Sequence, residues 1–450
     1  MAKRYLSIAC SNGGTGTYGH SVGTPQLRFD IANQGILQTQ ELRLQGTLKI
    51  IAKVATGGVL VGNQNTVLAN DVNINAFVGV QSFIDNLEIS SRVNATRSIE
   101  KINNYPMLVS SLMSSLHSKS GYDANLYHEQ GSKGVGMTTV NHNSRTVGAN
   151  PFTIVNQTQA QKKPFLQQNG FDFDLRLIAG MFMGQEEIDL EAIGGLSIVI
   201  NCNSDDNVLF GASAGNFRYE IHNPRIIVPV VDKSPQQQLA TKNAGIANFN
   251  FLTFVSLYNT LSSTDQQVVH RINLQSVVSN FQHYIPVSHI NNVAQDSIAQ
   301  YNPAVERLTY LQNGKRTPLE FVLEPEKEAN ITAANQLSST PQLLINYLDA
   351  YRNFRDVKKS CVNPTVSGFT AQTARVGVWG TGCSYDSVGQ SGINANGSTL
   401  GFEIKSSLDD PLNRGNQTPY SVYTFYLCKN QVQVDTQGNY YLFIVILFLI

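Results

Sequence analysis

Alternation of apolar and polar residues with a period of two is the feature that most constrains this sequence. In the run FDFDLRL, residues 171–177, four apolar side chains alternate with Asp172, Asp174 and Arg176. Successive side chains of a β-strand point to opposite faces of the sheet, so this pattern is typical of a strand with one buried face. Comparable short stretches, bounded by Gly, Asn, Asp or Ser, predict strands at 26–32, 41–55, 76–90, 171–183, 195–203, 217–231, 306–324 and 418–446. Many short strands with little helix predict a sandwich or a barrel.

Three helical segments interrupt the strands. Residues 105–117 place Leu108, Leu112 and Leu116 on one helical face, and 340–354 begins with a Thr-Pro pair that suits a helix start. A weaker segment, 234–249, separates the two halves of the chain. A strand leading into a helix and then into more strands occurs in each half, at an offset of about 220 to 235 residues.

This repeated order predicts a mainly β protein of two tandem eight-stranded jelly-roll barrels, with short helices in the long connections. A chain of 450 residues is also too long for one ordinary core. The expected boundaries are an N-terminal arm at 1–24, a first jelly roll at 25–233, a linker helix at 234–249 and a second jelly roll at 250–450.

Charge is scarce and balanced. The chain has 32 Lys and Arg against 32 Asp and Glu, and charged residues make up 14% of it, below the roughly 25% of an average domain. Sequence-specific nucleic-acid binding is not expected, because a protein that grips phosphates has a basic excess. A neutral, sparsely charged surface favours association between copies instead. Five cysteines without C-x-x-C spacing predict reduced thiols.

The segment SNGGTGTYGH, residues 11–20, carries Gly14, Gly16 and Gly19 at the G-x-G-x-x-G spacing of a dinucleotide-binding turn. Such a site needs a helix after the third glycine, because the helix N-terminus holds the pyrophosphate. Here Gly23 and Pro25 break any helix and a predicted strand follows. We therefore interpret the segment as a flexible arm that becomes ordered when a neighbouring subunit pairs with it.

Other candidates for chemistry are weaker still. The acidic run QEEIDLE, 185–191, lacks the D-x-D-x-D-G spacing of a calcium loop and is interpreted as a solvated connection. His283 and His289 lie about 20 Å apart on an extended chain, so we expect structural histidines. The nucleophile elbow G-x-S-x-G does not occur. The sequence thus predicts no catalytic residue, no metal site and no cofactor, and a protein that is not an enzyme.

A resemblance covers about two thirds of the chain. Residues 76–115 resemble the first-barrel segment of double jelly-roll major capsid proteins, in which a strand precedes an I-E-x-I-x-x-Y step and an amphipathic helix. Here that step is formed by Ile99, Glu100, Ile102 and Tyr105. Residues 171–203 and 217–231 resemble later strands of that barrel. Residues 308–321 and 383–427 are similar to capsid proteins of virophages and Polinton-like viruses.

The resemblance implies a structural protein of the virion, assembled inside the host cell. The apolar stretch of MAKRYLSIAC is far too short for a signal peptide, so no secretion signal is expected. It implies a homotrimer that forms a pseudo-hexameric capsomer, and capsomers that tile an icosahedral shell around a DNA genome. Neighbouring capsomers and penton, minor capsid or cement proteins are the partners that it implies, and an internal lipid membrane is a further candidate.

The expected assembly contacts lie mainly near the chain ends. The six candidate residues are Tyr18, His20, Trp379, Tyr441, Phe443 and Phe448. The last ten residues, YLFIVILFLI, are too few for a membrane-spanning helix, and both a buried strand and a membrane-facing tail remain possible for them. Trp379 suits either a core position or an interface.

A carbohydrate-binding or adhesin β-sandwich is the alternative function. Sugar-binding platforms favour exposed aromatic residues, and the chain has 18 tyrosines but one tryptophan. A glycan ligand bound by a monomer would favour this alternative, whereas a trimer that survives dilution would favour the capsid protein.

Overall fold

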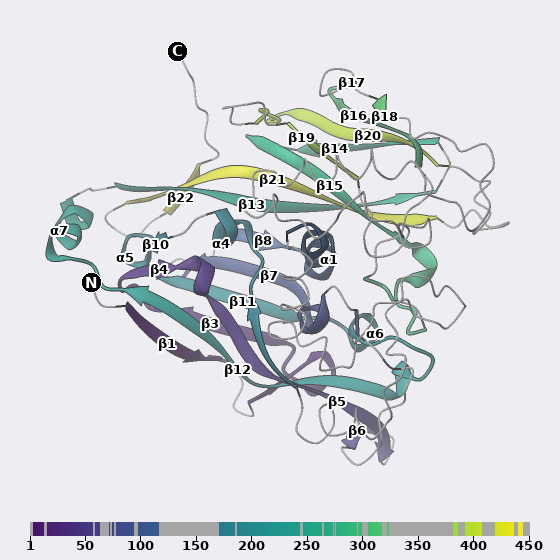
Figure 1. Ribbon diagram of the computed structural model, residues 1–450, viewed down its shortest axis with the longest axis horizontal. Helices are drawn as coiled ribbons and strands as arrows, with labels where there is room; N and C mark the ends of the chain where they lie inside the picture. Colours follow the sequence, from purple (N-terminus) through teal and green to yellow (C-terminus); the bar gives the residue numbers. More distant parts are fainter. Residues whose placement is uncertain are drawn as a thin grey trace, which may run out of the picture.

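The computed structural model has two β modules stacked on one another (Figure 1). It describes residues 3–443 apart from gaps at 13–15, 57–58, 64–71, 73, 76–77, 94–97, 117–170, 185–186, 244–245, 263–264, 273, 275, 295, 299–304, 317–321, 324–380, 386–391, 407–418 and 436–439. We refer to residues 3–233 as the first module and to residues 246–443 as the second module.

The first module consists of two antiparallel sheets. In one sheet, four main strands pair in the order β1 (Lys3–Ala9), β12 (Phe217–Val231), β5 (Arg43–Thr56) and β9 (Phe171–Arg176). The other sheet has the order β3 (Gln26–Ile31), β11 (Leu196–Cys202), β7 (Ile84–Ser91) and β8 (Ser98–Ile102). The shorter strands β2 (Thr17–Tyr18), β4 (Ile36–Gln38), β6 (Val59–Asn63) and β10 (Glu187–Asp189) extend the first of these sheets.

The second module repeats this order of pairing. Its first sheet runs β13 (Ile246–Leu261), β21 (Tyr420–Asp435), β15 (Val277–Pro286) and β19 (Thr381–Ser384). Its second sheet runs β14 (Asp265–Ile272), β20 (Ser398–Ser406), β16 (Val305–Gln312) and β17 (Lys315–Arg316), while β18 (Val322–Leu323) and β22 (Tyr440–Phe443) add to the edges. In both modules the eight main strands pair first to eighth, eighth to third and third to sixth in one sheet. In the other sheet they pair second to seventh, seventh to fourth and fourth to fifth. This is the arrangement of a jelly roll, so the expected fold class is confirmed.

The helices are short and lie in the connections. Within the described ranges they are α1 (Tyr105–Leu116), α4 (Gly180–Gly184), α5 (Leu190–Ile193), α6 (Asp205–Val208) and α7 (Pro235–Asn243), with the 3-10 turns η1 (His20–Val22), η2 (Thr39–Glu41), η3 (Gly79–Phe83), η6 (Ala214–Asn216) and η7 (Val287–His289). The helix expected at 105–117 is confirmed as α1. The helix expected at 340–354 lies outside the described residues. Among those residues, no helix has the length and apolar character needed to cross a membrane.

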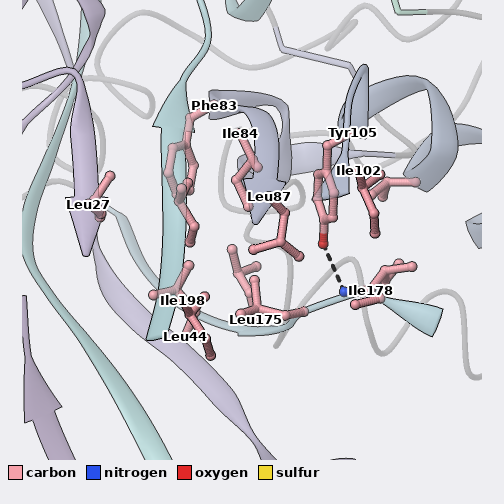
Figure 2. Close-up of a cluster of buried hydrophobic side chains, with 14 of the residues drawn as sticks. Leu27, Leu44, Phe83, Ile84, Leu87, Ile102, Tyr105, Leu175, Ile178 and Ile198 are labelled. Carbon is pink, nitrogen blue, oxygen red and sulfur yellow. Dashed lines mark hydrogen bonds between the residues drawn. The ribbon is translucent and has the colours of Figure 1, made fainter. Parts of the chain in front are cut away.

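The core of the first module lies between its two sheets. Figure 2 shows Leu27, Leu44, Phe83, Leu87 and Ile198 converging on one apolar cluster, and all of them are buried. In the alternating run at 171–177, Phe173, Leu175 and Leu177 are buried, whereas Asp172 is exposed and Asp174 and Arg176 are half-buried. The period of two therefore reports the inner face of β9.

The N-terminal residues belong to the first module and do not form an arm. β1 pairs with β12 over seven residues, from Lys3 opposite Val231 to Ala9 opposite Arg225. Leu6 and Ile8 of β1 pack against the core. The expectation of an arm at 1–24 is thus wrong, because this short apolar run completes the sheet that β12 would otherwise leave unpaired at its edge. The jelly roll begins at β1.

The predicted linker helix is also shorter than expected. α7 ends at Asn243 and β13 begins at Ile246, so the second jelly roll begins before residue 250.

The long strands predicted at 76–90 and 171–183 each contain a helical turn. In the first, Gly79 has φ 58° and opens η3, so that only β7 is extended. In the second, β9 ends at Arg176 and α4 begins at Gly180. The strand predicted at 306–324 is a hairpin, because Asn313 and Gly314 have φ values of 51° and 75° and turn β16 into β17.

Candidate functional site: the junction between the two modules

The hydrophobic core of the first module extends onto one face of the second module, whose own core, with Tyr284, Phe402 and Tyr426, is a separate cluster. The cluster that contains Leu87 and Ile102 of the first module continues into the second module through Phe251, Phe254, Phe281, Ile285, Ile298, Tyr423, Phe425 and Leu427. The rings of Phe281 and Phe425 stack at 5.2 Å, and Phe254 meets Phe281 edge-on at 6.2 Å. These rings lie on the face of the second module that packs against the first, so apolar packing holds the two modules together.

Glu100 joins three elements at this junction. Its Oε1 accepts hydrogen bonds from the backbone N–H of Gly180 at 3.0 Å and of Phe254 at 2.9 Å, and its Oε2 accepts from Met181 N–H at 3.0 Å. The carboxylate of β8 therefore satisfies the first amides of α4 and one amide at the edge of β13. Glu100 is 2% exposed. Burial raises the pKa of Glu100 to about 7, and the three backbone hydrogen bonds oppose that rise.

Gly180 allows the backbones of the two modules to meet. A Cβ atom at this position would lie 2.7 Å from the carbonyl oxygen of Leu252 and 2.8 Å from Cα of Thr253, both on β13. No side chain fits there, so glycine is required for close approach at this point.

Tyr105 stabilises the same region from within the first module. Its hydroxyl donates to Oε1 of Gln81 at 2.9 Å and accepts from the N–H of Ile178 at 2.8 Å, as Figure 2 shows for the second bond. The I-E-x-I-x-x-Y step thus has a physical role. Ile99 and Ile102 are buried in the core, Glu100 binds the second module, and Tyr105 fixes the chain that leads into α4.

A histidine from the second module makes another polar contact across the junction. His283 Nε2 lies 2.9 Å from the carbonyl oxygen of Ile298, which can only accept, so Nε2 carries the proton. Nδ1 of His283 then accepts from the hydroxyl of Ser111 on α1, at 2.9 Å. Both side chains are buried. His283 is a structural histidine, as the sequence predicts.

The chain after η7 contributes a third contact. Asn75 Nδ2 donates to Asp296 Oδ2 at 2.8 Å, and both residues are buried. Nearby, the N–H of Gly211 donates to the carbonyl oxygen of Val293 at 2.7 Å. Buried polar groups of this kind cost free energy unless they are paired, so these hydrogen bonds favour one relative position of the two modules.

The candidate assembly residues lie elsewhere. Tyr18 is 2% exposed and its hydroxyl donates to the carbonyl oxygen of Asn12 at 2.6 Å, so its side chain belongs to the first module's own core. His20 is exposed in η1. Tyr441 and Phe443 lie in β22, opposite Gln433 and Gln431 of β21. Trp379 and Phe448 lie outside the described residues.

The junction residues were only partly visible in the sequence. Glu100 and Tyr105 belong to the I-E-x-I-x-x-Y step, but the sequence alone assigns neither residue a role. A single carboxylate among Ile99 and Ile102 in a strand is the signal that could have been used, because a buried charge needs partners. Gly180 and Ser111 carry no comparable signal.

The two other sequence candidates also have structural roles. The segment after Gly19 is a 3-10 turn that ends at Gly23 with φ 85°, and β3 follows it. In the acidic run, Asp189 and Glu191 bind the buried ammonium of Lys233 at 2.6 and 3.0 Å, so this part of the run is an ion-pair site and not a solvated connection. In the part of the chain that the structure describes, no three potential ligands gather into a metal site.

Two jelly rolls in one chain, packed against each other through an apolar cluster, define a double jelly-roll protein. Neither the protein-family models nor the curated proteins give a match to the sequence.

Solved structures do match. The crystal structure of PBCV-1 VP54, fitted into a reconstruction of the virophage Sputnik, is similar with a TM-score of 0.56 and 10% identity, over 98% of this chain and 96% of that one. A cryo-EM structure of the Sputnik virophage gives 0.54 and 10%, over 98% and 88%. The mavirus major capsid protein gives 0.50 and 10%, over 98% and 90%. At such identities the likeness establishes the fold.

Proposed function

We propose that this chain is a viral major capsid protein. The observation that supports the proposal best is the junction, where an apolar cluster and the hydrogen bonds of Glu100 hold two similar barrels against each other. A subunit of a repeating shell must keep a defined geometry, and two barrels packed against each other provide one. The fold shared with the mavirus major capsid protein points the same way.

In this proposal three copies form a closed trimer. Each chain supplies two barrels, so threefold symmetry produces a capsomer with six barrels and a nearly hexagonal outline. Such capsomers tile an icosahedral shell around a DNA genome. The scarcity of charge suits extensive contact between copies, because little electrostatic repulsion keeps them apart.

The proposed location is the virion, and the proposed partners are neighbouring capsomers and penton, minor capsid or cement proteins. An internal lipid membrane is a further candidate partner. The role is structural, without catalysis and without sequence-specific recognition of nucleic acid.

Light scattering and negative-stain microscopy of the purified full chain test the proposal. We expect a mass of three chains that persists on dilution, and particles with a hexagonal outline. A chain that remains a monomer at all concentrations would refute the capsid role. A monomer that also binds a glycan on an array would support the carbohydrate-binding alternative.

A further inference from the structure

β1 and β13 occupy equivalent places in the two modules. Each is the first main strand of its jelly roll, and each pairs with the last main strand, β12 or β21. Each therefore lies at the outer edge of its sheet. An edge strand presents a row of backbone N–H and C=O groups that need partners.

In the second module this edge is covered by the first module. The N–H of Phe254 on β13 donates to Glu100, and the backbone of β13 at Leu252 lies against Gly180. The covering elements are α4 and β8, and β8 is itself the outer strand of the second sheet of the first module. A buried side chain of β8 and the backbone of α4 therefore cover this edge of β13.

The equivalent edge of the first module lacks such a cover among the described residues. β1 pairs with β12 alone, and Tyr5 is 61% exposed. Figure 1 shows β1 at the outer margin of the first module, whereas β13 lies between the modules. Among the described residues, no helix or strand covers the outer edge of β1 as α4 and β8 cover that of β13.

The sequence of β1 lacks the features that normally protect an edge. Residues 5–9, YLSIA, contain no charge, no proline and no glycine. Lys3 and Arg4 are charged, but they pair with Glu41 at 2.5 Å and with Asp232 at 2.6 Å. An uncharged, extended edge of this kind aggregates unless an assembly covers it.

We propose that the outer edge of β1 docks against the second module of a neighbouring copy, at the edge that carries β17 and β18. β17 holds the place in the second module that β8 holds in the first. The contact between copies then repeats the contact that β13 and β8 make within one chain. Figure 1 shows β1 and the β17–β18 edge on opposite sides of the molecule, as a head-to-tail contact requires.

This inference rests on the proposed function, because it gives the trimer its contact surface. Six junctions close a ring of six barrels: three lie within chains and three lie between chains.

A photoreactive benzoylphenylalanine at Tyr5 tests the docking directly. Full-length chains labelled with ¹⁵N are mixed with unlabelled chains, irradiated as the oligomer, and mapped by mass spectrometry. We expect cross-links between different copies, from residue 5 to the part of the second module near β16–β18. The same substitution at Val269, which is 49% exposed on β14, measures chance collisions at the same concentration.

The outcomes separate the two proposals. A chain that never exceeds a monomer refutes the capsid proposal, and the docking with it. A trimer in which residue 5 reacts only within its own chain, or only with a first module, refutes the docking and leaves the capsid proposal standing.

A pair of charges provides a second test. Tyr5→Lys with Ser7→Lys adds two cations to exposed positions of β1, so the monomer should fold while the association weakens about 100-fold or more, because the edge would bury unpaired charge. The control is Gln267→Lys with Val269→Lys, which adds the same charges to exposed positions of β14. Equal dissociation of both double variants would show a general charge effect and overturn the inference.

Discussion

Gly180→Ala should weaken the junction between the two modules without destabilising either module alone. The added Cβ would lie 2.7 to 2.8 Å from three backbone atoms of β13, in Leu252 and Thr253. Ordinary contacts begin near 3.4 Å, so β13 must retreat by about 0.6 Å. The backbone of Gly180 does not require a positive φ, and alanine favours a helix more than glycine does. The expected damage is therefore confined to the junction.

The size of the effect follows from two terms. Overpacking against a backbone that cannot rotate away costs about 1–3 kcal/mol. A retreat of about 0.6 Å would also stretch the 2.9 Å bond between Phe254 N–H and Glu100 beyond hydrogen-bond range, at a cost of about 1.5–3 kcal/mol for a charged acceptor. Because the two terms overlap, we expect a loss of about 2–4 kcal/mol in the free energy of unfolding.

Urea denaturation followed by circular dichroism measures this loss, and hydrogen exchange locates it. Exchange should rise at residues 251–256 of β13 before it rises elsewhere in the second module. The matched control is Gly215→Ala, also near the junction, where a Cβ would meet only Val293 at 3.9 Å. We expect a change within about 0.5 kcal/mol for the control. If Gly180→Ala proves as stable as Gly215→Ala, the close approach of the two backbones is not real.

Three further predictions concern the same chain. The free energy of unfolding should fall by on the order of 3 kcal/mol as the pH rises from about 4.5 to about 7, because the folded chain binds the Glu100 proton more tightly than the unfolded chain does. Glu100→Gln should flatten this dependence on pH. If the urea midpoints of the two proteins change equally with pH, the prediction is wrong. Removing residues 1–9 should lower the free energy of unfolding by about 2–4 kcal/mol, because the core loses Leu6 and Ile8. The truncated chain should also aggregate, because β12 gains a free edge. An unchanged melting temperature would support an independent N-terminal arm instead. Ser111→Ala should cost about 1–3 kcal/mol by removing the hydroxyl that donates to Nδ1 of His283, and a double-mutant cycle with His283→Leu should show coupling of similar size. Coupling near zero would mean that the hydrogen bond contributes nothing.

The overall architecture could be predicted because its signals are local. The strands at 26–32, 195–203 and 217–231 have nearly the same limits in the structure, and so does α1. Each of these segments has an apolar spacing that matches its own geometry, so local preference and final packing agree. The order of the strands then narrowed the fold class to a jelly roll in each half.

The errors arose where distant residues decide the local structure. Residues 177–183 read as a continued strand, but the α4 helix depends on a carboxylate at Glu100, far away in the sequence. The glycine-rich residues after β1 suggested a free arm, although β1 itself finds its partner more than 200 residues later, at β12. The hairpin at Asn313 and Gly314 is different, because the Asn-Gly pair is a local signal that predicts a two-residue turn.

The junction could not be predicted as a site. Its parts come from β8, α1, α4, β13 and β15, and none is unusual in its own segment. Ser111 and His283 form a pair only because the two modules stack. A contact of this kind is defined by tertiary geometry, which a single sequence does not reveal.

The short linker through α7 has a consequence for the energetics of association. Two barrels tied by the short segment between Val231 and Ile246 meet at an effective concentration on the order of millimolar, however dilute the protein becomes. Tethering removes the entropic penalty of bringing them together, so modest attraction suffices to keep that pair closed. Barrels on separate chains would have to find each other by diffusion, and their pairing would weaken with every dilution step.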